Sequence, residues 1–158
     1  MAIAVRTATS SDIDAVVELQ IGLFDADAGV HDPTTDLEWP RREGRADISD
    51  LLDNDSATVL VAVIDGETVG FLAGYTTPPS DIRPITSGVL RSLFVDEHAR
   101  RSGAARALVT TFVDWSRERG CQRVVVDHYA ANHGAATLYA SLGFEELSVT
   151  RVLSLQAP

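Results

Sequence analysis

Hydrophobic residues follow two kinds of pattern along the chain: short runs typical of strands, and repeats of about 3.6 residues typical of helices. Runs rich in β-branched and aromatic residues predict about seven strands, at residues 3–7, 58–64, 68–76, 89–95, 123–127, 144–147 and 150–155. Helical spacing predicts about four helices, at residues 10–25, 47–53, 104–119 and 132–142. The 158 residues therefore predict one domain, 1–158, of mixed α/β (α+β) class.

Turn and cap residues mark several boundaries of these elements. Thr9 and Asp12 have the spacing of a capping box at the start of the first helix. Asp65-Gly66 is a strong hairpin signal between the second and third strands. The order strand, helix, strand over residues 89–127 predicts a buried parallel pair joined by a right-handed crossover.

The loop after the fourth strand combines features of a phosphate-binding site. Residues 100–105 read Arg-Arg-Ser-Gly-Ala-Ala and stand at the start of the helix at 104–119. A helix N-terminus exposes unpaired N–H groups and the positive end of the helix dipole, and small side chains let an anionic oxygen reach them. Phosphate is therefore the expected ligand. The alternative is a solvated turn capped by Ser102.

Two motifs, in this order, resemble those of one enzyme family. Arg100-x-x-Gly103-x-Ala105, after a strand that ends Leu-Phe-Val, resembles the Q/R-x-x-G-x-G/A acyl-CoA pyrophosphate motif of the GNAT superfamily of N-acetyltransferases. Residues 132–144, with an Asn, a Tyr two helical turns on and then Gly-Phe, resemble its second signature. The resemblance implies a mostly antiparallel central sheet of about seven strands, with a parallel pair at its centre and about four flanking helices. It also implies acetyl-CoA as co-substrate and a primary amine as acceptor.

The same resemblance implies roles for individual residues. The acyl-CoA contacts would come from Leu93, Phe94 and Val95, whose backbone would pair with the pantetheine arm, and from Arg100, Arg101, Ser102, Gly103, Ala104 and Ala105, which would hold pyrophosphate. Asn132 would contact the pantetheine region, and Tyr139 would be the general acid that protonates the CoA sulfur. Asn132 and Tyr139 lie seven positions apart, about two helical turns, so both can face one ligand. The alternatives are an N-cap for Asn132 and a core aromatic for Tyr139.

The general base is not assigned. Many family members that acetylate amines carry a Glu on the fourth strand, where this chain has Arg91. His128 and Asp127, which follow the fifth strand and point to opposite faces, are the two candidates. Two further departures from the family pattern lie in the loop, where Glu97 replaces a frequent Pro and Ala99 replaces a frequent aromatic residue.

Charge is distributed unevenly along the chain. The formal net charge of −10 argues against nucleic acid as a partner, because phosphate repels a surface of that sign. Ten acidic residues lie from Asp25 to Asp55, in a polar segment that corresponds to the variable acceptor side of the family, and they predict a small cationic acceptor. The alternative is that they only keep the protein soluble. Trp39, in the same segment, either stacks on a substrate or covers the edge of the core.

Other residues limit the remaining functional classes. The single cysteine, Cys121, cannot form an internal disulfide, and no apolar run is long enough to cross a membrane, so we expect a cytoplasmic protein with no membrane partner. The histidines lack metal-binding spacing, which predicts no metal site. A homodimer is left open. We predict an N-acetyltransferase that acts on a small cationic amine by direct attack in a ternary complex; the alternatives are a non-catalytic acyl-CoA sensor and an acetyltransferase of protein N-termini or Lys.

Overall fold

A five-stranded sheet forms the centre of the computed structural model, which describes residues 2–156. Its strands lie in chain order: β1 (Ile3–Thr7), β2 (Ala57–Ile64), β3 (Glu67–Thr77), β4 (Ser87–Val95) and β5 (Arg123–Val126). β1 to β4 pair as antiparallel neighbours, whereas β4 and β5 are parallel. The sheet is therefore mixed, and its parallel pair lies at one edge.

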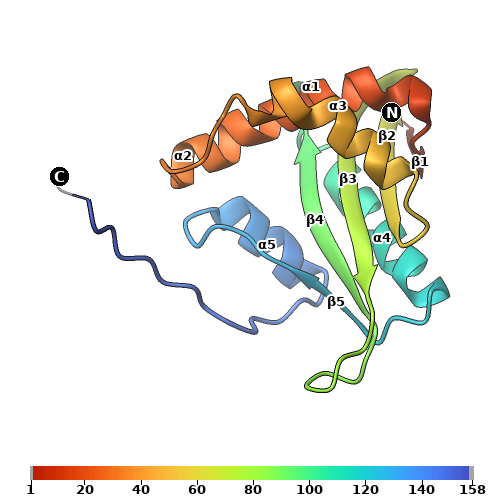
Figure 1. Cartoon of the computed structure of the whole chain (residues 1–158). Coiled ribbons are helices and arrows are strands. Elements are labelled where there is room, and N and C mark those ends of the chain that lie inside the picture. The colour runs from red at the N-terminus through yellow and green to blue at the C-terminus, as the bar shows by residue number, and fades with distance from the viewer. Residues whose placement is uncertain (1, 157–158) are drawn as a thin grey trace.

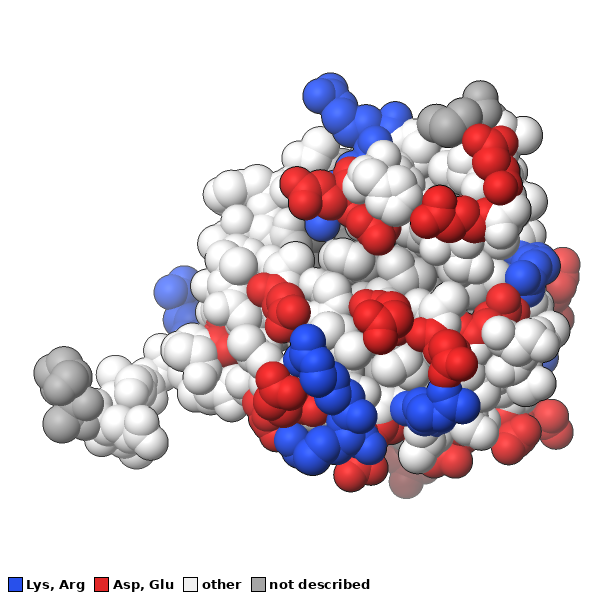
Figure 2. Space-filling view, turned by 90° about the horizontal axis from the view of Figure 1, so that it is seen from above, with Lys and Arg blue, Asp and Glu red and all other residues white. Residues whose placement is uncertain are grey.

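Helices cover both faces of this sheet (Figure 1). On one face, α1 (Ile13–Leu23) continues through a π-helical turn, η2 (Phe24–Ala28), into the short α2 (Gly29–His31), and α3 (Trp39–Leu52) packs beside α1. On the other face lies α4 (Ala104–Glu118), and α5 (His133–Ser141) contributes to the same core as α4. Acidic and arginine side chains are interspersed over the surface seen from above, where α1 and α3 lie (Figure 2).

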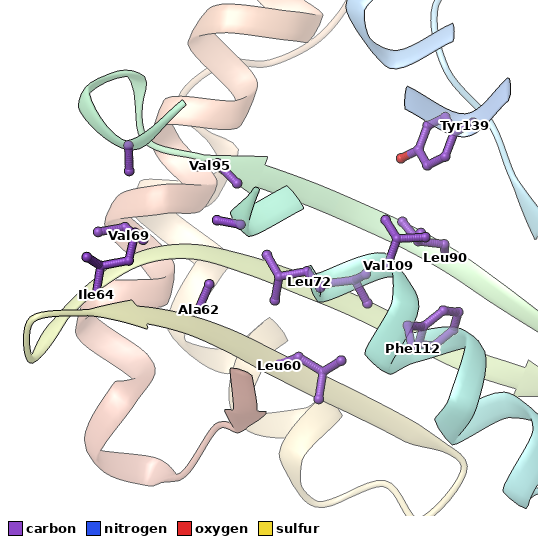
Figure 3. Close-up of a cluster of buried hydrophobic side chains, with 13 residues drawn as sticks. Leu60, Ala62, Ile64, Val69, Leu72, Leu90, Val95, Val109, Phe112 and Tyr139 are labelled. Carbon is purple, nitrogen blue, oxygen red and sulfur yellow. The ribbon is translucent and has the colours of Figure 1, made fainter. Parts of the chain in front are cut away.

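Two hydrophobic cores lie on the two faces of the sheet, because successive strand residues point to opposite sides. In one core, α1 and α3 cover Val61 and Phe71. In the other, α4 covers Leu72 and its neighbours (Figure 3). A Cβ at Gly74 would lie 2.4 Å from the ring of Phe112, so glycine lets α4 approach β3 closely.

Several predicted features are confirmed. Asp65 and Gly66, with φ values of 50° and 80°, form the hairpin turn between β2 and β3. Thr9 and Asp12 form the capping box of the short 3-10 helix η1 (Ser10–Asp12), which leads into α1. β4, α4 and β5 form the predicted strand–helix–strand unit with parallel strands.

The prediction of seven strands is wrong. Residues 144–147 and 150–155 are extended, but they pair with no strand among residues 2–156 and lead away from the body of the protein (Figure 1). The parallel pair consequently lies at an edge and not at the centre of the sheet. β5 is half-exposed rather than buried, since no strand covers its outer side.

The helices of the acidic segment are longer than predicted. Residues 39–52 form one helix, α3, whereas the sequence indicated only 47–53. Pro40 lies in the first turn of α3, where a proline needs no N–H donor, so it helps to begin the helix and does not interrupt one. The first helix also continues beyond Asp25, through η2 to the end of α2 at His31.

Candidate active site

β4 extends past the end of β5, which leaves part of its edge open. β5 pairs only with Ser87–Leu90, while β4 continues to Val95. Where this pairing ends, the register between β3 and β4 shifts, and Arg91 is an extra residue in β4 opposite Gly74. Such a bulge bends a strand. The backbone at 92–95 is thus available on this edge to an extended ligand.

The side chains of the three predicted pantetheine residues belong to the two cores. Leu93 and Val95 pack in the core beneath α4, and Phe94 packs against Gly22 of α1. Any contact of these residues with a ligand at the open edge would therefore come from their backbone, as the family resemblance implies. The carbonyl of Val95 already accepts a hydrogen bond from Arg100 Nε at 3.3 Å, which attaches the following loop to the end of β4.

The loop between β4 and α4 presents a set of backbone N–H groups. It passes through a 3-10 helix, η3 (Glu97–Ala99), and then through two residues of left-handed conformation, Arg101 at φ 62° and Gly103 at φ 91°. The amides of residues 101–103, 105 and 106 find no acceptor within residues 2–156. The Ala104 amide donates to Ser102 Oγ at 3.2 Å. Clustered donors at a helix N-terminus suit a phosphate group.

Three arginines surround this helix start. Arg100 and Arg101 are exposed, and the Arg100 guanidinium lies 5.7 Å from the centroid of the Phe94 ring. Arg106, which the sequence alone did not single out, donates from Nη2 to Ser141 Oγ at 2.7 Å and so connects α4 with α5. Cations at a helix N-terminus oppose the helix dipole unless an anion is bound there. Their presence therefore supports an anionic ligand at this loop.

Tyr139 combines a buried ring with an accessible hydroxyl. The residue is 7% exposed, and its ring centroid lies 6.0 Å from that of His128 and 5.5 Å from that of Phe144. Its hydroxyl is not among the buried polar atoms that lack a partner, and in Figure 3 it points away from the backbone of α5, over β4. Burial, together with the charge of Asp27, raises the pKa of Tyr139 to about 12. The hydroxyl thus stays protonated at neutral pH, which a proton donor requires.

Asn132 is the N-cap of α5 and also holds an acidic residue in place. Its Oδ1 accepts a hydrogen bond from the Ala135 amide at 3.0 Å, and its Nδ2 donates to Asp27 Oδ1 at 3.0 Å. Asn132 is therefore the N-cap of α5, as one of its two interpretations predicted, and both its Oδ1 and its Nδ2 atom have hydrogen-bond partners. Asp27 comes from η2 and lies 3.7 Å from His31 Nε2. Sequence reasoning missed Asp27, because nothing distinguishes it from the other acidic residues of its segment.

The two candidate bases lie on different sides of the end of β5. His128 is exposed, stacks on Tyr139 and has its Nδ1 3.0 Å from the carbonyl of Tyr129. Asp127 is also exposed, and it lines a pocket of about 160 Å³ between β4 and β5 together with Arg91. Both side chains border the open end of the parallel pair, so the two alternatives remain.

Arg91, at the position where many family members carry a Glu, is held by an acidic residue. Its guanidinium makes two hydrogen bonds to the carboxylate of Asp47 in α3, at 3.0 and 2.7 Å. Gln20, which is 2% exposed, donates to the same carboxylate at 3.0 Å. The ion pair connects α3 with the bulge in β4 and balances the charge of Arg91 beside the pocket.

Part of the acidic segment is neutralised within the protein. Besides the pair with Arg91, two acidic residues of this segment form ion pairs with nearby arginines, Asp36 with Arg42 and Glu38 with Arg41. Trp39 stacks on Phe24, with ring centroids 5.8 Å apart and an interplanar angle of 11°. Of its two interpretations, the structure favours the one in which Trp39 covers neighbouring apolar side chains.

Residues 2–156 contain no group of three or more His, Cys, Asp and Glu side chains placed to hold a metal ion. None of the helices in the same range combines the length and the apolar character that a membrane crossing requires.

Known proteins match this chain over most of its length. Residues 25–144 match the model of the Acetyltransferase (GNAT) family. The chain is 30% identical over 159 residues to an aminoglycoside N(6')-acetyltransferase type 1 of Stenotrophomonas maltophilia, covering 98% of this chain and 92% of that protein. It is 28% identical over 142 residues to the uncharacterized N-acetyltransferase YhfO of Bacillus subtilis, covering 90% and 89% of the two chains.

Solved structures share the fold. The aminoglycoside N-acetyltransferase AAC(6')-Iy in complex with CoA has a TM-score of 0.77 at 19% identity, covering 99% of this chain and 96% of that one. A transcriptional regulator from Bacillus halodurans has a TM-score of 0.79 at 22% identity, covering 98% and 100%. The chain belongs to the GNAT family, which uses acetyl-CoA, and it is an N-acetyltransferase.

Proposed function

We propose that this protein transfers the acetyl group of acetyl-CoA to the primary amine of a small cationic acceptor, by direct attack in a ternary complex. The observation that carries the proposal is the open edge of β4 at 92–95, which continues directly into the amide-rich loop at 100–105. Tyr139 lies over the same strand (Figure 3). An extended thioester with a phosphate at one end matches this arrangement of edge, loop and proton donor.

The residues of the loop and of the open edge fit acetyl-CoA. The free amides of residues 101–103, 105 and 106, with Arg100, Arg101 and Arg106, would hold the pyrophosphate, and the backbone of 93–95 would pair with the pantetheine arm as a strand does. Bound in this way, acetyl-CoA supplies an activated acyl group. To contact the pantetheine, the Asn132 side chain would break its hydrogen bond with Asp27 or the one with the Ala135 amide, because these bonds use its Nδ2 and Oδ1 atoms.

The reaction needs two proton movements. The attacking amine must be neutral, and the departing thiolate must receive a proton. Tyr139 would donate its hydroxyl proton to the sulfur. His128 or Asp127 would accept the proton of the amine, directly or through water. Arg91 does not replace the Glu of other family members as a base, because a guanidinium stays charged at any pH that proteins tolerate.

Two carboxylates support a cationic acceptor. Asp27 lies near enough to Tyr139 to contribute to its raised pKa, and Asp127 lines the pocket at the end of β5. Both negative charges are therefore near the proposed reaction centre, where they would attract an ammonium group. The name of the relative from Stenotrophomonas maltophilia makes aminoglycosides the first acceptors to test.

A thiol-release screen tests the proposal. The full chain is mixed with acetyl-CoA and one acceptor at a time, taken from aminoglycosides, polyamines, amino acids and peptides, and free CoA thiol is measured. We expect release with a small cationic amine and none without an acceptor. Release with peptides alone would instead indicate acetylation of protein N-termini or Lys. Acetyl-CoA binding in calorimetry with no release from any acceptor would indicate a sensor and contradict the proposal.

A further inference from the structure

Two charged residues of opposite sign line the pocket of about 160 Å³ between β4 and β5. They are Arg91 and Asp127, and the other described residues of the lining are apolar except for Tyr75. The pairing of β4 with β5 ends at Leu90 and Val126. Arg91 and Asp127 are the residues that follow, one on each side of the opening. A cation and an anion at such neighbouring positions are expected to attract each other.

Arg91 instead forms its ion pair with Asp47 of α3. Both side chains are partly covered, with exposures of 32% at Arg91 and 17% at Asp47, so water and salt screen this pair less than a pair on the open surface. Asp127 forms no ion pair and no side-chain hydrogen bond within residues 2–156. Its carboxylate is therefore available to a ligand in the pocket.

Gln20 of α1 holds Asp47 in this position. Its Nε2 atom donates to the carboxylate that also accepts from Arg91, and an ionised carboxylate, which has only acceptors, matches these three donors. A Cβ at Gly44 would lie 2.7 Å from Gln20 Oε1, so glycine lets α3 approach Gln20 closely. The Oε1 atom is buried without a partner among residues 2–156, which is costly. An apolar side chain would avoid this cost, so the bond to Asp47 is the contribution of Gln20.

We propose that Asp47 determines acceptor specificity by holding Arg91 away from Asp127 and neutralising its charge. With Arg91 held in this way, the pocket keeps the free carboxylate of Asp127 for an ammonium group and offers no free cation to an acceptor carboxylate. The inference rests on the proposed function and narrows it to amines that carry no carboxylate, such as polyamines and aminoglycosides, in preference to amino acids. Asp47 acts through Arg91 and is a positioning residue.

Two acceptors that differ by one carboxylate test this role. Cadaverine and lysine share a five-carbon diamine chain, and lysine adds the carboxylate. The ratio of their kcat/KM values in thiol release should favour cadaverine in the wild type. Asp47→Asn keeps the size of the side chain but leaves the charge of Arg91 uncompensated, so the ratio should fall about tenfold. Asp50→Asn removes the same charge from an exposed position of α3 and should change the ratio by about twofold at most.

A compensating variant separates this role from packing. Arg91→Gln alone should raise the ratio, and Arg91→Gln combined with Asp47→Asn should return it close to that of the wild type, because the net charge of the pair is again zero. A purely structural role would lower turnover of both acceptors alike and leave the ratio unchanged, which would overturn the proposal.

Calorimetry with CoA bound gives the same ratio from dissociation constants and does not depend on turnover. Preferential binding of cadaverine that Asp47→Asn abolishes, without thiol release, would support the role of Asp47 while the proposed function fails. A wild type that prefers cadaverine in neither measurement, or a double variant that stays as low as Asp47→Asn, would overturn the proposal. Urea denaturation checks that each variant is folded.

Discussion

The rings of His128 and Tyr139 lie nearly parallel, with centroids 6.0 Å apart and an interplanar angle of 18°. One of these residues is a candidate base and the other the candidate acid, so two groups of the proposed proton transfer share one stacked pair. Phe144 makes an edge contact with the same tyrosine, at a centroid distance of 5.5 Å. These contacts involve the ring alone. A substitution that keeps the ring and removes the hydroxyl therefore separates chemistry from packing.

Tyr139→Phe should lower turnover and leave binding intact. Removal of a positioned general acid typically costs about 10² to 10⁴ fold in rate. The affinity for acetyl-CoA and the free energy of unfolding should stay close to those of the wild type, because the aromatic contacts remain. Thiol-release kinetics, calorimetry and urea denaturation measure the three quantities. Normal turnover would leave Tyr139 with its packing role alone, and a joint loss of stability and affinity would make its hydroxyl a structural group.

The raised pKa of Tyr139 predicts a loss of stability at high pH. The folded pKa of about 12 lies above the ordinary value of 10 because the ring is buried. As the pH rises from 10 to 12, the unfolded chain loses this proton first, and the free energy of unfolding should fall. Below pH 10 the contribution is fully present. The tyrosinate absorbance of the wild type minus that of Tyr139→Phe should titrate near pH 12, and a midpoint near 10 would contradict the burial.

The parts of the fold that depend only on residues adjacent in the sequence were predictable from it. The Asp65-Gly66 hairpin is one example, because its backbone conformation is set by the two turn residues themselves. The segment after Phe144 is the opposite case. Its apolar residues at 144–147 and 150–155 predicted two strands that the structure does not contain, because a strand also needs a partner and no local pattern contains one. The edge position of β5 has the same origin.

The candidate site divides in the same way. The loop at 100–105 could be predicted, since its small residues, arginines and helix start are contiguous. Two polar contacts of the site could not be predicted, the one between Asp47 and Arg91 and the one between Asp27 and Asn132. Their partners are 44 and 105 positions apart in the sequence. Each pair forms only because the fold brings distant elements together: α3 meets β4 in the first pair, and η2 meets the start of α5 in the second. The missing Glu on the fourth strand was visible in the sequence, but the residue that neutralises Arg91 was not.

Asp12→Asn should reduce stability at neutral pH. The Asp12 carboxylate accepts two hydrogen bonds from Arg6, at 2.8 and 3.0 Å, and one from the Thr9 amide at 2.8 Å. The guanidinium of Arg6 is the main cause that lowers the pKa of Asp12 to about 2; burial opposes this shift, and the Thr9 amide lowers the pKa further. Arg6 is half-exposed, so solvent screening limits the expected loss to about 1 to 2 kcal/mol.

The pH dependence supplies the check on Asp12. Because its folded pKa is depressed, its contribution is present above the unfolded value of 3.8 and is lost as the pH falls toward 2. Urea unfolding at several pH values should therefore show a smaller acid-induced loss in Asp12→Asn than in the wild type. Asp50→Asn is the control, because Asp50 is exposed in α3. Parallel acid profiles for the wild type and Asp12→Asn would contradict the role of this ion pair.

Asp27→Asn should raise the Michaelis constant for a cationic acceptor. The variant keeps an acceptor oxygen for Asn132 Nδ2 but removes the negative charge near Tyr139. Loss of one attractive charge pair near a protein surface should raise the constant about threefold or more, and added salt should do the same to the wild type. Asp50→Asn again serves as the control. If neither the variant nor salt changes the Michaelis constant, the acidic segment only keeps the protein soluble.

Arg100→Ala should weaken acetyl-CoA binding. A charge-assisted contact with phosphate contributes about 1.5 to 3 kcal/mol, which corresponds to roughly tenfold to more than a hundredfold in the dissociation constant. Arg100 also donates to the Val95 carbonyl, so its removal could loosen the loop instead. Urea denaturation separates the two effects, because a loss of phosphate contact leaves the free energy of unfolding nearly unchanged. Arg117→Ala is the matched control, since Arg117 is an exposed arginine at the opposite end of α4. Equal affinities of Arg100→Ala and Arg117→Ala in calorimetry would show that Arg100 does not bind the phosphate.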